Sequence, residues 1–101
     1  MNKSIHTKQY RKLIGIIREE RELRHITQEQ LASMLSVQQA IISKIENCER
    51  RLDIIEFRQI CIALGVSIID VINKFETKYE NEITVSREAG RQVATNYEKI
   101  D

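Results

Sequence analysis

Two short amphipathic segments, separated by only two residues, place the strongest constraint on how this chain folds. Thr27 suits the start of the first segment, because its hydroxyl can accept from free backbone N–H groups while Gln30 bonds back in a capping box. The second segment covers about residues 38–47. The break between them, residues 36–37, is too short for two helices to stack antiparallel. We therefore predict two successive short helices, about 28–35 and 38–47, that do not lie antiparallel.

Helical spacing of apolar side chains continues before and after this pair. The further helices predicted from it cover about residues 7–24, 53–64 and 67–75. Asp53 can cap the fourth helix, Gly65 suits its left-handed end, and either Ser67 or Asp70 opens the fifth. The side chains expected on the inner faces are Tyr10, Leu13, Ile14, Ile17, Leu31, Ala32, Leu35, Ile42, Ile45, Cys61, Ile68, Val71, Ile72 and Phe75, together with some of Ile54, Phe57, Ile60 and Leu64.

The chain also lacks the turn residues that an all-β fold needs. It has no proline and only 3 glycines in 101 residues, whereas β-sheets need frequent turn residues. We therefore predict an all-α fold: a compact five-helix bundle in a domain of residues 1–75, with a C-terminal extension over residues 76–101. Within the extension, residues 83–85 are a short β-prone run, and Ser86 can cap a helix through Tyr97.

Several function classes lack the residues that they require. Cys48 and Cys61 form no ligand-spaced cluster with His6 or His25, so we expect no metal and no cofactor. No paired carboxylates or activated nucleophile can be assembled, so we do not expect an enzyme. The N-terminus lacks the apolar run of a signal peptide, and no stretch approaches ~18 apolar residues, so we expect a cytoplasmic protein without a membrane partner.

The charges are distributed unevenly, although the net charge of the whole chain is only +1. Residues 1–75 carry 12 basic and 9 acidic side chains, whereas residues 76–101 carry 4 and 6. The weak basic excess therefore lies in the predicted bundle, where a nucleic-acid contact would need it.

The predicted helix 38–47 has an outer face without acidic residues. When its inner isoleucines face the core, the side chains on or beside the outer face are Gln39, Ala40, Ile41, Ser43, Lys44 and Asn47. Gln39 can form a bidentate pair with adenine, Lys44 can bond to guanine or a phosphate, and Ala40 or Ile41 can contact a thymine methyl group. We therefore predict that residues 39–41, 43 and 44 face the bases of double-stranded DNA. The alternative is an ordinary solvated helix surface.

Phosphate contacts are predicted around this face, from Gln28, Gln38, Asn47, Arg50 and Arg51. Gln28 lies in the first turn of its helix, where its amide and the nearby backbone N–H groups can hold a phosphate. Arg50 and Arg51 add positive charge to the following loop. The alternative for these two arginines is a purely solubilising role, since acidic residues are adjacent in the sequence.

These residues resemble the phage repressor and Cro type of helix-turn-helix, the XRE family. The matching stretch is TQEQLASMLSVQQAIISKIENCERRLDIIEFRQICIALGVSIIDVI, which with the preceding helix covers about residues 10–75. The resemblance implies a bundle of the lambda-repressor-like DNA-binding type, with a positioning helix at about 28–35 and a recognition helix at about 38–47. It also implies a close helix crossing at Ala32 and an ion pair between Arg21 and Glu46.

The same resemblance assigns roles to several of the residues singled out above. It implies a phosphate contact for Gln28, base-facing positions for Gln39, Ala40 and Lys44, and a DNA backbone contact for Asn47. The sequence departs from the family pattern at Ser36 and Cys48, where the family usually has glycine. A left-handed conformation at a residue other than glycine costs roughly 1 kcal/mol, so the fold is expected to tolerate both.

The function expected from these features is transcription regulation, by repression, through a homodimer on a near-palindromic operator. Apolar Ile68, Ile69, Ile72 and Phe75 exceed what one helix face needs for a core, so some of them are candidates for the dimer contact. Two alternatives stay open. One is an antitoxin-like autoregulator that binds a partner protein through residues 76–101, and the other is a protein-interaction module without DNA binding.

Overall fold

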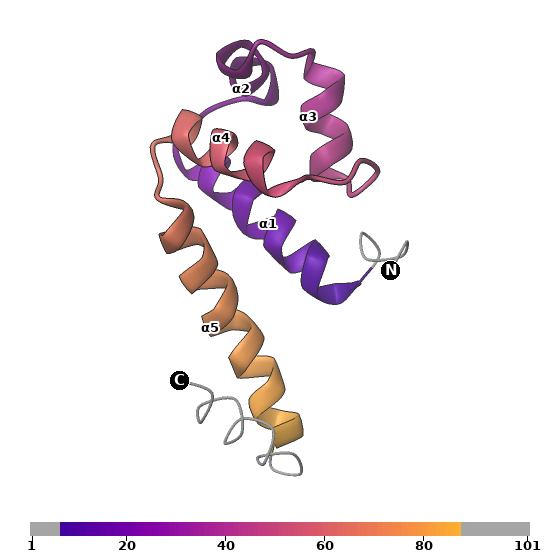
Figure 1. Ribbon diagram of the computed structural model, residues 1–101, viewed down its shortest axis with the longest axis vertical. Coiled ribbons are helices and arrows are strands. Elements are labelled where there is room, and N and C mark those ends of the chain that lie inside the picture. The colour runs from indigo at the N-terminus through magenta and orange to yellow at the C-terminus, as the bar shows by residue number, and fades with distance from the viewer. Residues whose placement is uncertain (1–6, 88–101) are drawn as a thin grey trace.

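The computed structural model describes residues 7–87, and within them the chain forms five helices and no strand (Figure 1). The helices are α1 (Lys8–Leu23), α2 (Gln28–Leu35), α3 (Gln39–Glu46), α4 (Ile54–Leu64) and α5 (Ile68–Arg87). The predicted all-α fold is therefore confirmed.

Side chains satisfy the free N–H groups at the start of most of these helices. Thr27 and Gln30 form the predicted capping box of α2, and Asp53 forms a second capping box with Glu56 at the start of α4. Ser67, rather than Asp70, opens α5, because its hydroxyl accepts from the backbone of the new helix. Local sequence therefore decides where these helices begin.

Among residues 7–87, four take the left-handed backbone conformation, each of them between two helices. Gly65 does so after α4, as predicted, with a φ of 76°. Ser36 and Cys48, the two departures from glycine, do so with φ values of 57° and 59°. His25 is a further case, with a φ of 57°, that the sequence does not indicate. Each residue other than glycine costs roughly 1 kcal/mol in this conformation, which packing elsewhere must offset.

In the part of the chain that the structure describes, the core is one cluster of side chains from all five helices. Its buried members are Ile14, Ile16, Ile17, Leu31, Ala32, Ile42, Ile45, Phe57, Ile60, Cys61, Leu64 and Val71. Helical spacing does not predict Ile16, because it lies off the apolar stripe of α1. Of the four side chains from which the burial of α4 was expected, Phe57, Ile60 and Leu64 are buried, whereas Ile54, the first residue of the helix, is 61% exposed and lines a surface groove of about 370 Å³.

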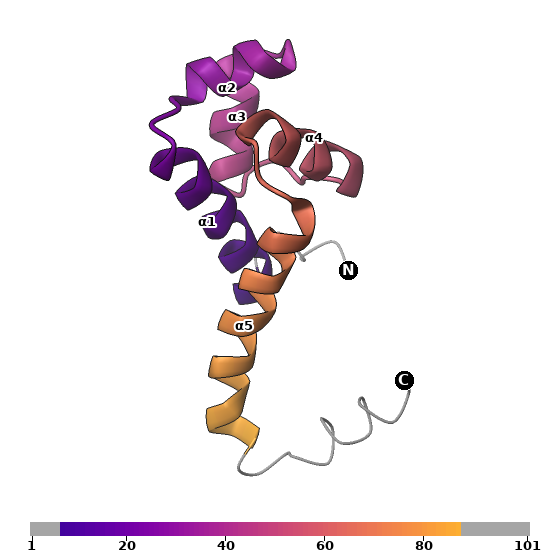
Figure 2. The ribbon, with the colours of Figure 1, turned by 90° about the vertical axis from the view of Figure 1, so that its left-hand side faces the viewer.

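The helix α5 differs from the predicted fifth helix in length. Its first turns pack on α1 and α4, and the rest extends beyond the globule in both views (Figures 1 and 2). The backbone is helical to Arg87, so the expectation of a β-prone run at residues 83–85 is wrong, and Ser86 lies inside this helix. An established helix gains one hydrogen bond for each residue added, which outweighs the small helix penalty of β-branched residues. The suggested helix through Tyr97 lies outside the described residues.

A buried carboxylate attaches α5 to α1. Glu20 is 3% exposed and accepts hydrogen bonds from Arg24, at 2.6 Å, and from Lys74 of α5. The hydrogen bond from Lys74, against the opposing effect of burial, lowers the pKa of Glu20 below its ordinary value of 4.5. Arg24 acts in the same direction.

We expect Glu20 to make folding pH-dependent in the acid range. Its pKa is lower in the folded state, so its stabilisation is complete above pH 4.5 and is lost as the pH falls through the folded value. Urea unfolding of Glu20→Gln should give lower stability at pH 7 and a shallower loss of stability below about pH 4.5. Glu56→Gln is the matched comparison for the dependence of stability on pH, because the hydrogen bond from Arg50 lowers the pKa of Glu56 in the same direction. Curves for Glu20→Gln and wild type that run parallel would contradict this assignment.

Candidate nucleic-acid interface

The helices α2 and α3 pack against each other and cross steeply, as Figures 1 and 2 both show. Ala32 is 3% exposed, so the small residue lies inside the α2 part of the core. After α2, the chain turns at left-handed Ser36, and the N–H of Val37 donates to the carbonyl of Ala32 at 3.0 Å. This turn sets the start of α3 relative to α2.

The structure places α3 with its polar side outward. Gln39, Ala40, Lys44 and Asn47 are exposed, whereas Ile41 and Ser43 are half-buried. Gln38 caps α3 with its backbone only, and its side chain is exposed. The only acidic residue of α3, Glu46, is buried, so the exposed side has no carboxylate. Such a surface can approach the polyanionic edges of a duplex groove without repulsion.

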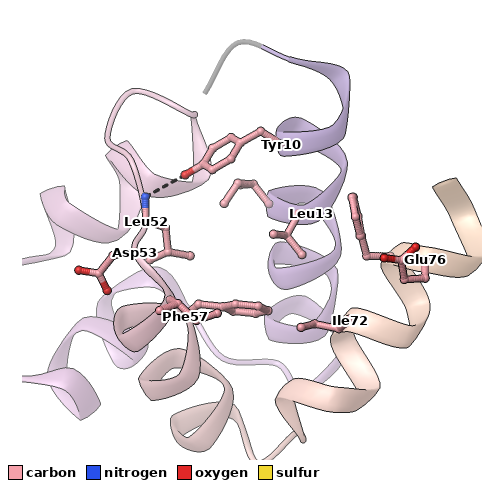
Figure 3. A pocket seen from close by; sticks show the side chains of 10 residues that line it. Tyr10, Leu13, Leu52, Asp53, Phe57, Ile72 and Glu76 are labelled. Atoms are coloured by element: carbon pink, nitrogen blue, oxygen red, sulfur yellow. Dashed lines mark hydrogen bonds between the residues drawn. The ribbon is translucent and has the colours of Figure 1, made fainter. Parts of the chain in front are cut away.

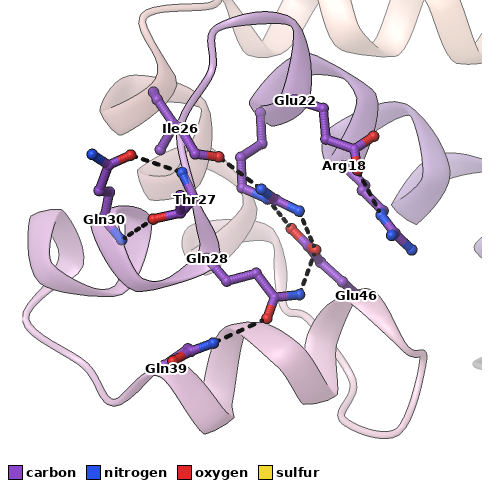
Figure 4. A network of polar contacts seen from close by, with 9 residues as sticks. Arg18, Glu22, Ile26, Thr27, Gln28, Gln30, Gln39 and Glu46 are labelled. Carbon is purple, nitrogen blue, oxygen red and sulfur yellow. Dashed lines mark hydrogen bonds and ion pairs between the residues drawn. The ribbon is translucent and has the colours of Figure 1, made fainter.

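A chain of hydrogen bonds runs from α1 through Glu46 to the exposed start of α3 (Figure 4). Arg21 holds Glu46 with two bonds, Nε to Oε2 at 2.7 Å and Nη2 to Oε1 at 2.9 Å. The side-chain amide of Gln28 donates to the same Oε1 at 2.9 Å, and its carbonyl accepts from the Gln39 amide at 3.5 Å. Four side chains from three helices are thereby linked.

The ion pair in this chain of bonds is almost fully buried. The side chains of Arg21 and Glu46 are 8% and 2% exposed, and Arg21 also donates to the carbonyl of Ile26 at 2.7 Å. The hydrogen bonds to Glu46, against the opposing effect of burial, raise the pKa of Arg21. Arg21 thus stays charged, and the geometry of the pair orients α1, α2 and α3 relative to one another.

The network leaves Gln39 with unused hydrogen-bonding capacity. One N–H of its amide donates to Gln28, while the second N–H and the carbonyl oxygen form no bond that involves the described residues. One donor and one acceptor are the groups that a bidentate pair with adenine requires. The side-chain carbonyl of Gln28 and one N–H of its amide are bonded to Gln39 and to Glu46. Gln28 therefore orients Gln39 even when its second N–H binds another group.

The two arginines of the loop after α3 differ in their surroundings. Arg50 donates to both carboxylate oxygens of Glu56, at 3.3 and 2.8 Å, and its own backbone N–H donates to the carbonyl of Lys44. The hydrogen bonds to Glu56 raise the pKa of Arg50. Arg50 thus ties the end of α3 to the start of α4, whereas Arg51 is exposed.

Among the described residues, we looked for activated cysteines, metal ligands and membrane-spanning helices. Burial raises the pKa of Cys61 to about 11 and also raises that of half-buried Cys48, so neither is an activated thiolate. Residues 7–87 contain no cluster of three groups that could hold a metal ion. In the same part of the chain, no helix is long and apolar enough to span a membrane.

Sequence reasoning missed the contacts that join these residues. Gln28 and Gln39 are 11 residues apart, and Gln28 and Glu46 are 18 apart. Helical spacing gives no signal at such separations, because they depend on how α2 crosses α3. The pairing of Arg50 with Glu56 had no sequence signal either.

Comparisons with known proteins agree with this geometry. The helix-turn-helix family model matches residues 17–71, from the middle of α1 to the first turn of α5. A solved structure, "XRE-family like protein from Pseudomonas syringae pv. tomato str. DC3000", is 39% identical, and the alignment covers 76% of this chain and 94% of that chain with a TM-score of 0.69. Among curated proteins, none matches the sequence significantly. The chain belongs to the XRE, or Cro/C1-type, helix-turn-helix family of DNA-binding transcription regulators.

Proposed function

We propose that the protein recognises a specific double-stranded DNA sequence by placing α3 in the major groove. The observation that carries this proposal is the exposed, acid-free side of α3, whose first residue is oriented by the network from Arg21 to Gln39. A side chain that is oriented before binding loses less entropy on contact, which favours specific readout over non-specific adhesion.

In this proposal, the bases are read by residues 39–41, 43 and 44. Gln39 forms the bidentate pair with adenine, and Lys44 bonds to guanine or a phosphate. Ala40 and half-buried Ile41 supply apolar contacts to thymine methyl groups, and Ser43 lies at the edge of the contact. Phosphates on either side bind Gln38, Asn47 and Arg51, and also the N–H groups at the start of α2 near Gln28.

The structure of the loop changes the role that we propose for Arg50. Its guanidinium is engaged by Glu56, so phosphate binding would have to compete with a charge-assisted, two-point contact. We therefore propose that Arg50 chiefly holds the loop in place. For Arg51, which is exposed, we keep the predicted phosphate contact.

We further propose that two copies bind a near-palindromic operator and repress transcription by occupying the promoter. One short recognition helix contacts only a few base pairs, too few for tight selective binding. The exposed apolar side chains of α5 suit a contact between copies, since Ile69 is 66% and Ile72 is 38% exposed. Two half-sites about one helical turn apart, about 34 Å, are the expected spacing.

Selection of bound sequences from random duplex DNA at about 150 mM salt tests this proposal. We expect an inverted repeat, and a loss of about 1–3 kcal/mol, or roughly 5-fold to 150-fold in affinity, for Gln39→Ala and for Lys44→Ala. Each variant should relax the preference at one base position. Enrichment of a single half-site would contradict the dimer. Absence of any enrichment would contradict specific readout and favour a protein partner bound through residues 76–101.

A further inference from the structure

The first turns of α1 are rich in positive charge. Lys8, Arg11 and Lys12 lie there, and no acidic residue precedes Glu19 in this helix. Cations at a helix N-terminus are unfavourable, because the free N–H groups already carry partial positive charge. Lys8 and Arg11 are exposed and add nothing to the core. Their placement therefore suggests an external anionic partner.

These cations lie beside the loop that follows α3. The N–H of Leu52 donates to the hydroxyl of Tyr10 at 2.9 Å, which holds the first turns of α1 against this loop (Figure 3). Burial raises the pKa of Cys48 in the loop, and the nearby charge of Arg11 acts in the opposite direction. Arg11 is thus close to the end of α3, although it is far from it in sequence.

Basic side chains outnumber acidic ones in the two segments that meet here. Residues 8–12 and 48–56 together contain five basic and three acidic side chains. Two of these acidic side chains already have partners within the protein, since Asp53 caps α4 and Glu56 binds Arg50. The positive surface therefore runs from the end of α3, through exposed Arg51, to Arg11 and Lys8.

We infer that the DNA backbone contact continues from α3 across the loop onto α1, where Arg11 and Lys8 bind phosphates of the duplex that α3 reads. This inference rests on the proposed function. The two residues are one helical turn apart, so they lie on the same side of α1 and can face the same strand. Their contacts are to phosphate, and they contribute affinity without sequence preference.

The salt dependence of binding tests this inference for Arg11→Ala and for the double variant Lys8→Ala/Arg11→Ala. Each phosphate contact contributes about −0.9 to the slope of log K against log salt. Each phosphate-binding side chain removed should make the slope less steep by about 0.9, so that the fall in affinity between about 50 and 200 mM salt shrinks about 3.5-fold. Base preference should stay unchanged. Arg58→Ala, which removes an exposed cation of α4, is the matched control and should keep the wild-type slope.

The same titrations are run on the selected operator and on a random duplex, so that the two proposals fail separately. Wild-type slopes for the α1 variants on both duplexes would overturn the inference and leave specific readout by α3 standing. Equal slope changes for Arg58→Ala would also overturn it, because the effect would then be one of net charge. Relaxed base preference in Arg11→Ala would contradict the phosphate assignment. If wild type shows no operator preference, the proposed function fails, while the random duplex still reports on Arg11.

Discussion

Replacing Glu46 with glutamine is expected to lower the free energy of unfolding by about 3–5 kcal/mol, the cost of removing one partner from a buried ion pair. The amide keeps the shape of the carboxylate, but Arg21 remains charged in a site where its side chain is only 8% exposed. The acceptor for Gln28 also changes, so the orientation of Gln39 is weakened as well. Urea denaturation measures the first effect, and binding to the selected operator measures the second.

A double variant separates the ion pair from the packing around it. In Arg21→Met/Glu46→Leu, neither charge of this pair is left buried without its partner, so the double variant should be more stable than either single variant. Its DNA binding should nevertheless stay weak, because Gln28 no longer has its anchor. If the two single substitutions instead have small, additive effects, the pair is not coupled and does not hold the three helices together.

Replacing Leu31 with alanine is expected to cost about 2–5 kcal/mol, because the substitution leaves a cavity in the centre of the core. Leu31 is 1% exposed and is the main apolar side chain that α2 contributes. For a small domain, whose total stability is about 5–15 kcal/mol, this is a large fraction. The loss is measured as a lower urea midpoint with an unchanged denaturant slope.

Met34→Ala provides the control for Leu31 on the same helix. Met34 is 53% exposed, so its truncation should change stability by no more than about 0.5 kcal/mol. Similar losses for the two variants would mean that α2 does not pack with the face described above, and the orientation of α3 would then be in doubt as well.

Much of the fold was predictable because its signals are local. The capping boxes at Thr27 and Asp53, the left-handed Gly65 and the inner isoleucines of α3 all depend on residues within a few positions of one another. The length of α5 was not predictable in this way. Its later residues have weak apolar periodicity, and a β-prone run within an established helix does not stop it.

The same distinction between local and long-range contacts applies to the candidate interface. The sequence by itself determined which side of α3 faces outward, because burial of Ile42 and Ile45 leaves only one arrangement of a helix with 3.6 residues per turn. Only the tertiary structure decided that Gln28 bonds to Gln39, that Arg50 is engaged by Glu56, and that Arg11 lies beside the loop after α3. The physical reason is that these contacts join residues far apart in the chain, whose separation depends on helix crossings and loop paths that no local pattern encodes.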